Sequence, residues 1–146
     1  MKKPNFELLK DAYAIINGIP DEIVNLDSII QSRGDSLECG TVACAIGWLG
    51  MHPKFQKLLN PTAGNYPDWV IGGELHCDHS AAAAALFRID QEDGFNLFSS
   101  SQNSRYDRKF DRALGHKAMF LHRVKSFLKE RGEWKGLTDC KGPVSC

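Results

Sequence analysis

Apolar residues recur every three to four positions along most of this chain, a spacing typical of helices that bury one face. Between these stretches lie short segments rich in glycine, proline, serine and asparagine, which favour turns and loops. The pattern predicts helices over Asn5–Asn17, Thr41–Met51, Pro53–Asn60, Ala81–Phe87, the residues from Asp90 to Phe98, and Asp107–Arg131. Trp69–Ile71 suits a short strand, and Ile23–Ile30 suits either a strand or a helical turn.

These elements predict a mainly α fold. We expect a single compact helical domain over residues 1–136, which could include one short β element. Its parts are a central helix of small residues, a helical hairpin over Ala81–Phe98 and a long amphipathic C-terminal helix. Residues 137–146 are expected to form a loose tail. A length of 146 residues suits one domain.

The chain shows neither of the apolar segments that direct a protein to a membrane or out of the cell. No apolar run approaches the roughly 20 residues of a membrane span. The basic start is followed by Glu7, Lys10 and Asp11, which interrupt the apolar core that a signal peptide needs. We therefore expect a cytoplasmic protein with no membrane contact, in which the five cysteines are free thiols.

Charge is unevenly distributed along the chain, although the formal net charge is zero. Residues 1–104 carry 7 lysines and arginines against 13 aspartates and glutamates, a net charge of −6. Residues 105–131 carry 9 against 3, a net charge of +6. The positive residues of this basic stretch are Arg105, Arg108, Lys109, Arg112, Lys117, Arg123, Lys125, Lys129 and Arg131.

Two interpretations of the basic stretch remain open. Clustered lysines and arginines bind acidic partners or nucleic-acid phosphates, with Arg105, Arg108, Lys109, Arg112 and Lys117 as the binding residues. Alternatively, the charges form the solvated face of an amphipathic helix that packs on the acidic part of the chain. In that case its apolar stripe is buried against the body or a second copy. The expected stripe is Phe110, Leu114, Leu121, Val124 and Leu128.

A thiol site is the main enzymatic alternative. Cys39 precedes the predicted central helix, and a cysteine at a helix N-terminus can have a lowered pKa. In a papain-like arrangement, His76 or His79 would act as the base and Asp78 or Asp68 would orient it. The spacing of 37–40 residues between Cys39 and these histidines is short for such a fold.

The same region contains residue types that bind zinc, but in an unfavourable arrangement. Cys39, Cys44, His76, Cys77 and His79 could supply nitrogen and sulfur ligands. Cys39 and Cys44 are five positions apart, which on a helix turns the two side chains by about 140°. Adjacent His76 and Cys77 would share one ion poorly. We therefore predict no metal site and no cofactor.

The segment Cys39–Trp48 carries a Cys-Gly-Thr-x-x-Cys core followed by small residues, glycine and tryptophan. It resembles small bacterial and bacteriophage proteins of unknown function that share this core. The alanine-rich segment ending in Leu86-Phe87, followed by Leu97-Phe98, looks like a second landmark of that family. The resemblance covers roughly residues 25–100. It implies a bacterial or phage setting and carries no catalytic residues over.

The sequence lacks the Walker, dinucleotide-binding, Gly-x-Ser-x-Gly and His-Glu-x-x-His motifs. We expect a small non-enzymatic bacterial or phage interaction protein, leaning away from an enzyme, that binds a protein partner from the host or a second copy of itself. A homodimer is compatible with this expectation. The alternatives are a hydrolase or transferase that uses Cys39, and nucleic-acid binding through residues 105–131. The reactivity of Cys39 separates the first alternative from the rest.

Overall fold

The first helix, α1, spans Phe6–Asn17 in the computed structural model. The structure describes residues 3–24, 26, 30–31, 42–43, 45–62, 68–76, 78–99 and 104–134. The Asn5 side chain caps α1 by accepting a hydrogen bond from the Leu8 backbone N–H at 3.1 Å, and Gly18 follows its end. The predicted first helix is therefore confirmed, and its first turn is stabilised by this cap.

The other described elements alternate short helices with two pairs of strands. In chain order they are η1 (Asp21–Ile23), β1 (Ile30–Gln31), β2 (Val42–Ala43), α2 (Ala45–Met51), α3 (Pro53–Leu59), β3 (Trp69–Ile71), β4 (Glu74–His76), α4 (His79–Phe87), α5 (Gln91–Phe98), η2 (Arg105–Lys109), η3 (Arg112–Leu114) and α6 (His116–Glu130). The η elements are 3₁₀ turns. Strand β1 pairs with β2 and β3 with β4, both antiparallel. The fold is mainly α, as predicted.

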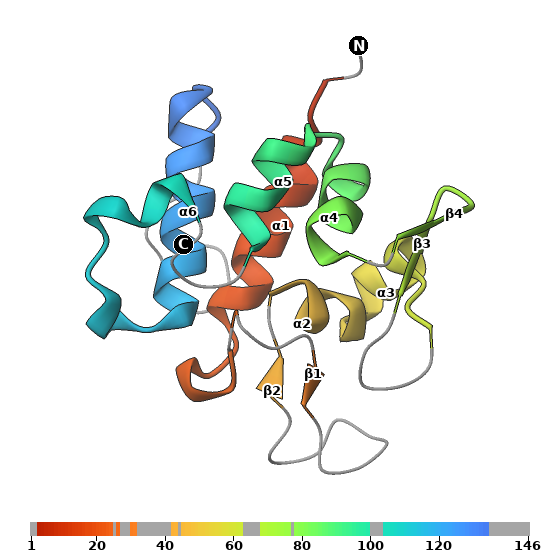
Figure 1. The fold of residues 1–146 in the computed structure, drawn as a ribbon, viewed down its shortest axis with the longest axis horizontal. Helices are drawn as coiled ribbons and strands as arrows, with labels where there is room; N and C mark the ends of the chain where they lie inside the picture. Colours follow the sequence, from red (N-terminus) through yellow and green to blue (C-terminus); the bar gives the residue numbers. More distant parts are fainter. Residues whose placement is uncertain are drawn as a thin grey trace.

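Helix α1 lies at the centre of the molecule and contacts α2, α4 and α6 (Figure 1). In the view of Figure 1, α6 and the turns η2 and η3 lie at one end and the β3–β4 hairpin at the other. Four buried phenylalanines connect these parts: ring centroids are 6.2 Å apart between Phe55 and Phe87, 5.5 Å between Phe87 and Phe98, and 5.2 Å between Phe98 and Phe120. The core thus runs continuously through α3, α4, α5 and α6.

The predicted hairpin over Ala81–Phe98 is present as α4 and α5. Asp78 caps α4 through the Ser80 N–H at 3.0 Å, and Asp90 caps α5 through the Asp93 N–H at 2.7 Å. The two helices approach closely: a Cβ atom at Gly94 would lie 2.6 Å from the Ser80 carbonyl oxygen. Among the described helices, none has the length and apolar character that a membrane span requires.

The central helix is shorter than predicted. It begins at Ala45, while Val42–Ala43 form strand β2, so the prediction of a helix from Thr41 is wrong. The β-branched Val42 pairs with Gln31 of β1, and this ladder takes the backbone groups that a longer helix would need. The helix therefore begins six positions after Cys39 in the sequence. Cys39 and Cys44 themselves lie outside the described residues.

Trp69 of strand β3, rather than Trp48, is the fully buried tryptophan. Its ring lies over α2, where a Cβ atom at Gly50 would be 2.7 Å from Trp69 Cζ3. The small residues of α2 thus let a tryptophan ring approach the helix. Gly72 and Gly73 connect β3 to β4 with φ values of 60° and 85°, which suit a type I′ hairpin turn.

Candidate functional site

The basic stretch does not form one helix. Residues 105–114 form the turns η2 and η3, and α6 begins only at His116, so the prediction of a continuous helix over Asp107–Arg131 is wrong. Gly115 has a φ of 95°, a conformation that interrupts any helix. Ser104 and Asp111 cap the two turns through their side-chain oxygens. Figure 1 shows this segment extending outward from α6, on the side away from α1.

A buried ion pair fixes η2 to α6. Arg123 is fully buried and donates to both carboxylate oxygens of Asp107, from Nε at 2.9 Å and from Nη2 at 2.7 Å. Its Nη1 donates to the Ser99 carbonyl oxygen at 2.9 Å, at the end of α5. The expectation that the charges of α6 face outward is wrong for Arg123. Three elements share one guanidinium, which no pattern along a single helix reveals.

A second, more exposed network ties η2 to the end of α6. Arg105 donates to both carboxylate oxygens of Glu130, at 3.1 and 2.9 Å, and the Tyr106 hydroxyl donates to Glu130 at 3.0 Å. The hydrogen bond from Arg105 is the main reason why the pKa of Glu130 lies below its ordinary value. Burial, assisted by the hydrogen bond to Glu130, raises the pKa of Tyr106 to about 12.

Between these anchors and α6 the segment presents cations and an apolar side chain to solvent. Arg108, Lys109 and Arg112 are exposed, and none takes part in an ion pair within the described part of the chain. Leu114, beside them, is 59% exposed, which corrects the expectation that it belongs to a buried stripe. We call these four residues the basic turn surface.

Phe110 of the same segment packs against α6. The Phe110 ring is half-buried and lies 5.1 Å, centroid to centroid, from the His122 ring of α6. The expected burial of Phe110 is thus partly realised, against α6 itself. Val124 and Leu128 are fully buried and Leu121 is half-buried, as the stripe predicted.

The five predicted binding residues divide into two groups. Arg105 is engaged by Glu130, and Lys117 forms an ion pair with Asp21 at 3.3 Å. Arg131 likewise pairs with Asp93 at 3.1 Å. These contacts between Lys117 or Arg131 and the acidic half agree with the packing interpretation of the charge pattern. Arg108, Lys109 and Arg112 remain available to a partner.

The predicted catalytic residues are described only in part. His76 lies on β4, and its Nε2 atom is buried without a hydrogen-bond partner. Asp78 caps α4, and His79 is the first residue of that helix, with its side chain outside the described part. Because Cys39 and Cys77 also lie outside it, the thiol hypothesis stays a prediction. Among the described residues, no group of three or more metal-binding side chains is found.

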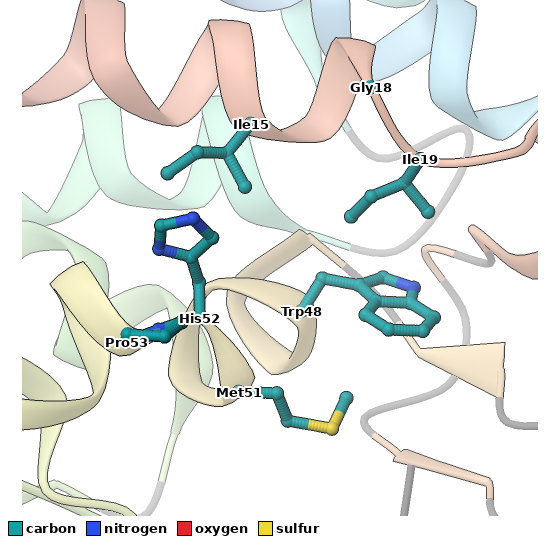
Figure 2. A pocket seen from close by; sticks show the side chains of 7 residues that line it. All are labelled: Ile15, Gly18, Ile19, Trp48, Met51, His52 and Pro53. Atoms are coloured by element: carbon teal, nitrogen blue, oxygen red, sulfur yellow. The ribbon is translucent and has the colours of Figure 1, made fainter. Parts of the chain in front are cut away.

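The structure also contains an apolar groove that the sequence did not indicate. It lies between the end of α1 and the junction of α2 and α3, with a volume of about 360 Å³ (Figure 2). Its lining residues are Ile15, Gly18, Ile19, Trp48, Met51, His52 and Pro53. They come from elements about 30 positions apart in the sequence, so no local motif indicates the groove.

The chain was compared with protein-family models, with curated proteins and with solved structures, and no match was found. The resemblance to small bacterial and bacteriophage proteins therefore stays a prediction.

Replacing Glu130 by glutamine should destabilise the protein slightly at pH 7, by up to about 1 kcal/mol, because the pair with Arg105 is partly exposed. The folded-state pKa of Glu130 is lowered, so its stabilising effect is present above the ordinary pKa of 4.5 and is lost as the pH falls through the folded-state value. Urea unfolding at pH 7, 5 and 3 should therefore show a difference between parent and variant that shrinks towards pH 3.

The exposed Glu74 on β4 provides the control for this variant. Glu74→Gln should follow the parent at all three pH values. A Glu130→Gln difference that stayed constant with pH would show that the charge of Glu130 does not stabilise the network.

Proposed function

We propose that this chain is a small non-enzymatic interaction protein that binds an acidic protein partner through the basic turn surface. The observation that carries this proposal is the exposed set Arg108, Lys109 and Arg112 beside the exposed Leu114. Exposed charges steer association with a partner of opposite charge, and an apolar side chain among them adds contact area that phosphates would not use.

The rigidity of the segment supports the proposal. The Arg123–Asp107 pair, the Arg105–Glu130 pair and the Phe110–His122 contact hold both ends of η2 against α6. A surface held in place in the free protein loses less conformational entropy on binding than a flexible loop does. In the bacterial or phage setting that the resemblance implies, the partner would be a host protein or a second copy of this chain, whose residues 1–104 carry a net charge of −6.

The test is fluorescence anisotropy with a labelled peptide of alternating glutamate and leucine, at about 50 and 200 mM salt. We expect saturable binding that weakens with salt, and at least a tenfold loss of affinity in Arg108→Glu/Arg112→Glu. Leu114→Ser should weaken binding without changing its salt dependence. The matched control is Lys57→Glu/Lys129→Glu, which changes the net charge equally at exposed positions outside the surface and should bind like the parent.

Equal affinity of the parent and Arg108→Glu/Arg112→Glu would contradict the proposal. A DNA or RNA duplex tested in parallel addresses the nucleic-acid alternative, since phosphate contacts give a steep loss of affinity with salt. Tighter binding of the duplex than of the peptide, abolished in the same double variant, would replace the protein partner with a nucleic acid. Sedimentation of the parent at both salt concentrations tests a second copy as the partner.

A further inference from the structure

The apolar groove lined by α1, α2 and α3 is independent of the basic turn surface. Figure 2 shows Ile15 and Ile19 of the α1 side opposite His52 and Trp48 of the α2 side. Its volume of about 360 Å³ falls within the roughly 300–1,000 Å³ of small-molecule sites, which are usually formed before the ligand arrives.

Two interactions lie next to the walls of this groove. The Trp48 indole N–H donates to the Ile23 carbonyl oxygen at 2.8 Å, which fixes the orientation of the indole ring. The Lys54 ammonium pairs with Asp11, one turn before Ile15 on α1, and so joins α3 to α1. The hydrogen bond thus orients one wall of the groove, whereas the half-exposed ion pair contributes little to its shape.

The groove contains one polar group suited to a ligand. His52 caps α3: its Nδ1 atom accepts a hydrogen bond from the Lys54 backbone N–H at 3.1 Å. In the neutral ring the proton is then on Nε2. In Figure 2 the His52 ring extends towards Ile15, across the groove. Nε2–H is thus a hydrogen-bond donor among apolar side chains.

The charges around the groove indicate what it would bind. Among the side chains that line the groove only His52 is ionisable, and the nearby Asp11 and Lys54 form an ion pair with each other. A charged ligand would lose hydration on entering the apolar groove, and the lining residues include no carboxylate, lysine or arginine to pair with it. We propose that this groove is a binding site for a neutral, largely apolar small molecule whose single carbonyl oxygen accepts a hydrogen bond from His52 Nε2–H.

Prodan, a neutral dimethylaminonaphthalene with one ketone, serves as the probe because its emission shifts to the blue in an apolar site. Titration of the parent should give a saturable blue shift with one site per chain. Gly18 lies in the groove wall with an ordinary φ of −86°, so Gly18→Trp adds a ring there without backbone strain. This variant should abolish the shift. His52→Ser keeps a residue suited to capping α3 and should weaken binding roughly two- to tenfold, the effect of one hydrogen bond.

Leu75→Gln is the matched control, because Leu75 is 59% exposed on the β3–β4 hairpin, outside the groove. It should bind prodan like the parent. The absence of a saturable shift in the parent, or an undiminished shift in folded Gly18→Trp, would overturn the proposal. A loss in Leu75→Gln equal to that in Gly18→Trp would also overturn it, since it would indicate adsorption to exposed apolar side chains.

A measurement on the parent protein covers the case in which Gly18→Trp does not fold. Addition of prodan should shift the NMR signals of the Trp48 indole N–H and the Met51 methyl group, and leave the Trp69 indole signal in place. Shifts confined to the hairpin or to α6 would contradict the assignment of the groove.

Discussion

The Arg123→Met variant is expected to lose about 3–5 kcal/mol of folding free energy, because it leaves the carboxylate of Asp107 buried without its guanidinium. Arg123 also donates a hydrogen bond to the Ser99 carbonyl oxygen, and the variant would remove this donor. Methionine fills much of the same volume, so the loss would come from unpaired polar groups and not from a cavity. Urea unfolding followed by circular dichroism measures the effect.

The double variant Arg123→Met/Asp107→Leu separates charge burial from packing. Replacing both members of a buried pair by apolar residues is often neutral or stabilising. We therefore expect the double variant to be more stable than Arg123→Met, and less stable than the parent because the Ser99 carbonyl oxygen remains unpaired. Lys129→Met, at an exposed cation of the same helix, should change stability by less than about 0.5 kcal/mol. If Arg123→Met were as stable as Lys129→Met, the pair would not be buried in solution.

Gly94→Ala should destabilise the protein, although alanine is the better helix former by about 1 kcal/mol. The new Cβ atom would lie 2.6 Å from the Ser80 carbonyl oxygen and 3.1 Å from Ala84 Cβ. Both belong to α4, whose backbone cannot move away without separating the hairpin. Overpacking of this kind typically costs about 1–3 kcal/mol, which exceeds the gain in helix propensity. Thermal and urea unfolding of the variant test this expectation.

Ala85→Gly gives the matched comparison, since Ala85 is exposed on α4 of the same hairpin. It should lose about 1 kcal/mol through helix propensity alone. A Gly94→Ala variant more stable than the parent would show that α4 and α5 are farther apart in solution than the structure indicates.

Local signals along the chain determined most of the helices. Asn5, Asp78 and Asp90 have short polar side chains that satisfy free N–H groups at helix starts, and each caps the helix that follows it. Pro53 begins α3 for a similarly local reason, because its missing N–H costs nothing at that position. Such interactions span three residues or fewer, so the sequence alone contains them.

The basic stretch shows where this local reasoning fails. Its apolar residues at helical spacing suggested one long helix, but Gly115 and the capped turns break it before His116. The choice between a helix and two 3₁₀ turns depends on what the turns can reach. Asp107 reaches Arg123, and Phe110 reaches His122, both on the later helix. These contacts span 12 to 16 positions and appear only when the chain has folded.

The sequence shows that residues 105–131 are basic, but it does not show which of their side chains are exposed. Clustered lysines and arginines identify a basic segment by themselves, because charge does not depend on the fold. Tertiary structure decided which of them are exposed: Arg108, Lys109 and Arg112 remain exposed, while Arg105 and Lys117 form ion pairs and Arg123 is buried. Exposure depends on which elements pack around a side chain, and residues distant in the sequence supply those elements.

Helix α2 and the groove beside it also show what the sequence determines and what packing decides. Glycine lowers helix stability by about 1 kcal/mol relative to alanine, and at Gly50 the missing side chain leaves space over the helix. The sequence could not say that a tryptophan ring from β3 would occupy that space over Gly50, or that Trp48 would line an open groove. Local hydrogen bonding and periodicity thus determined where most helices form in this protein. Packing between distant segments decided which residues are buried, which charges are paired and where a cavity remains.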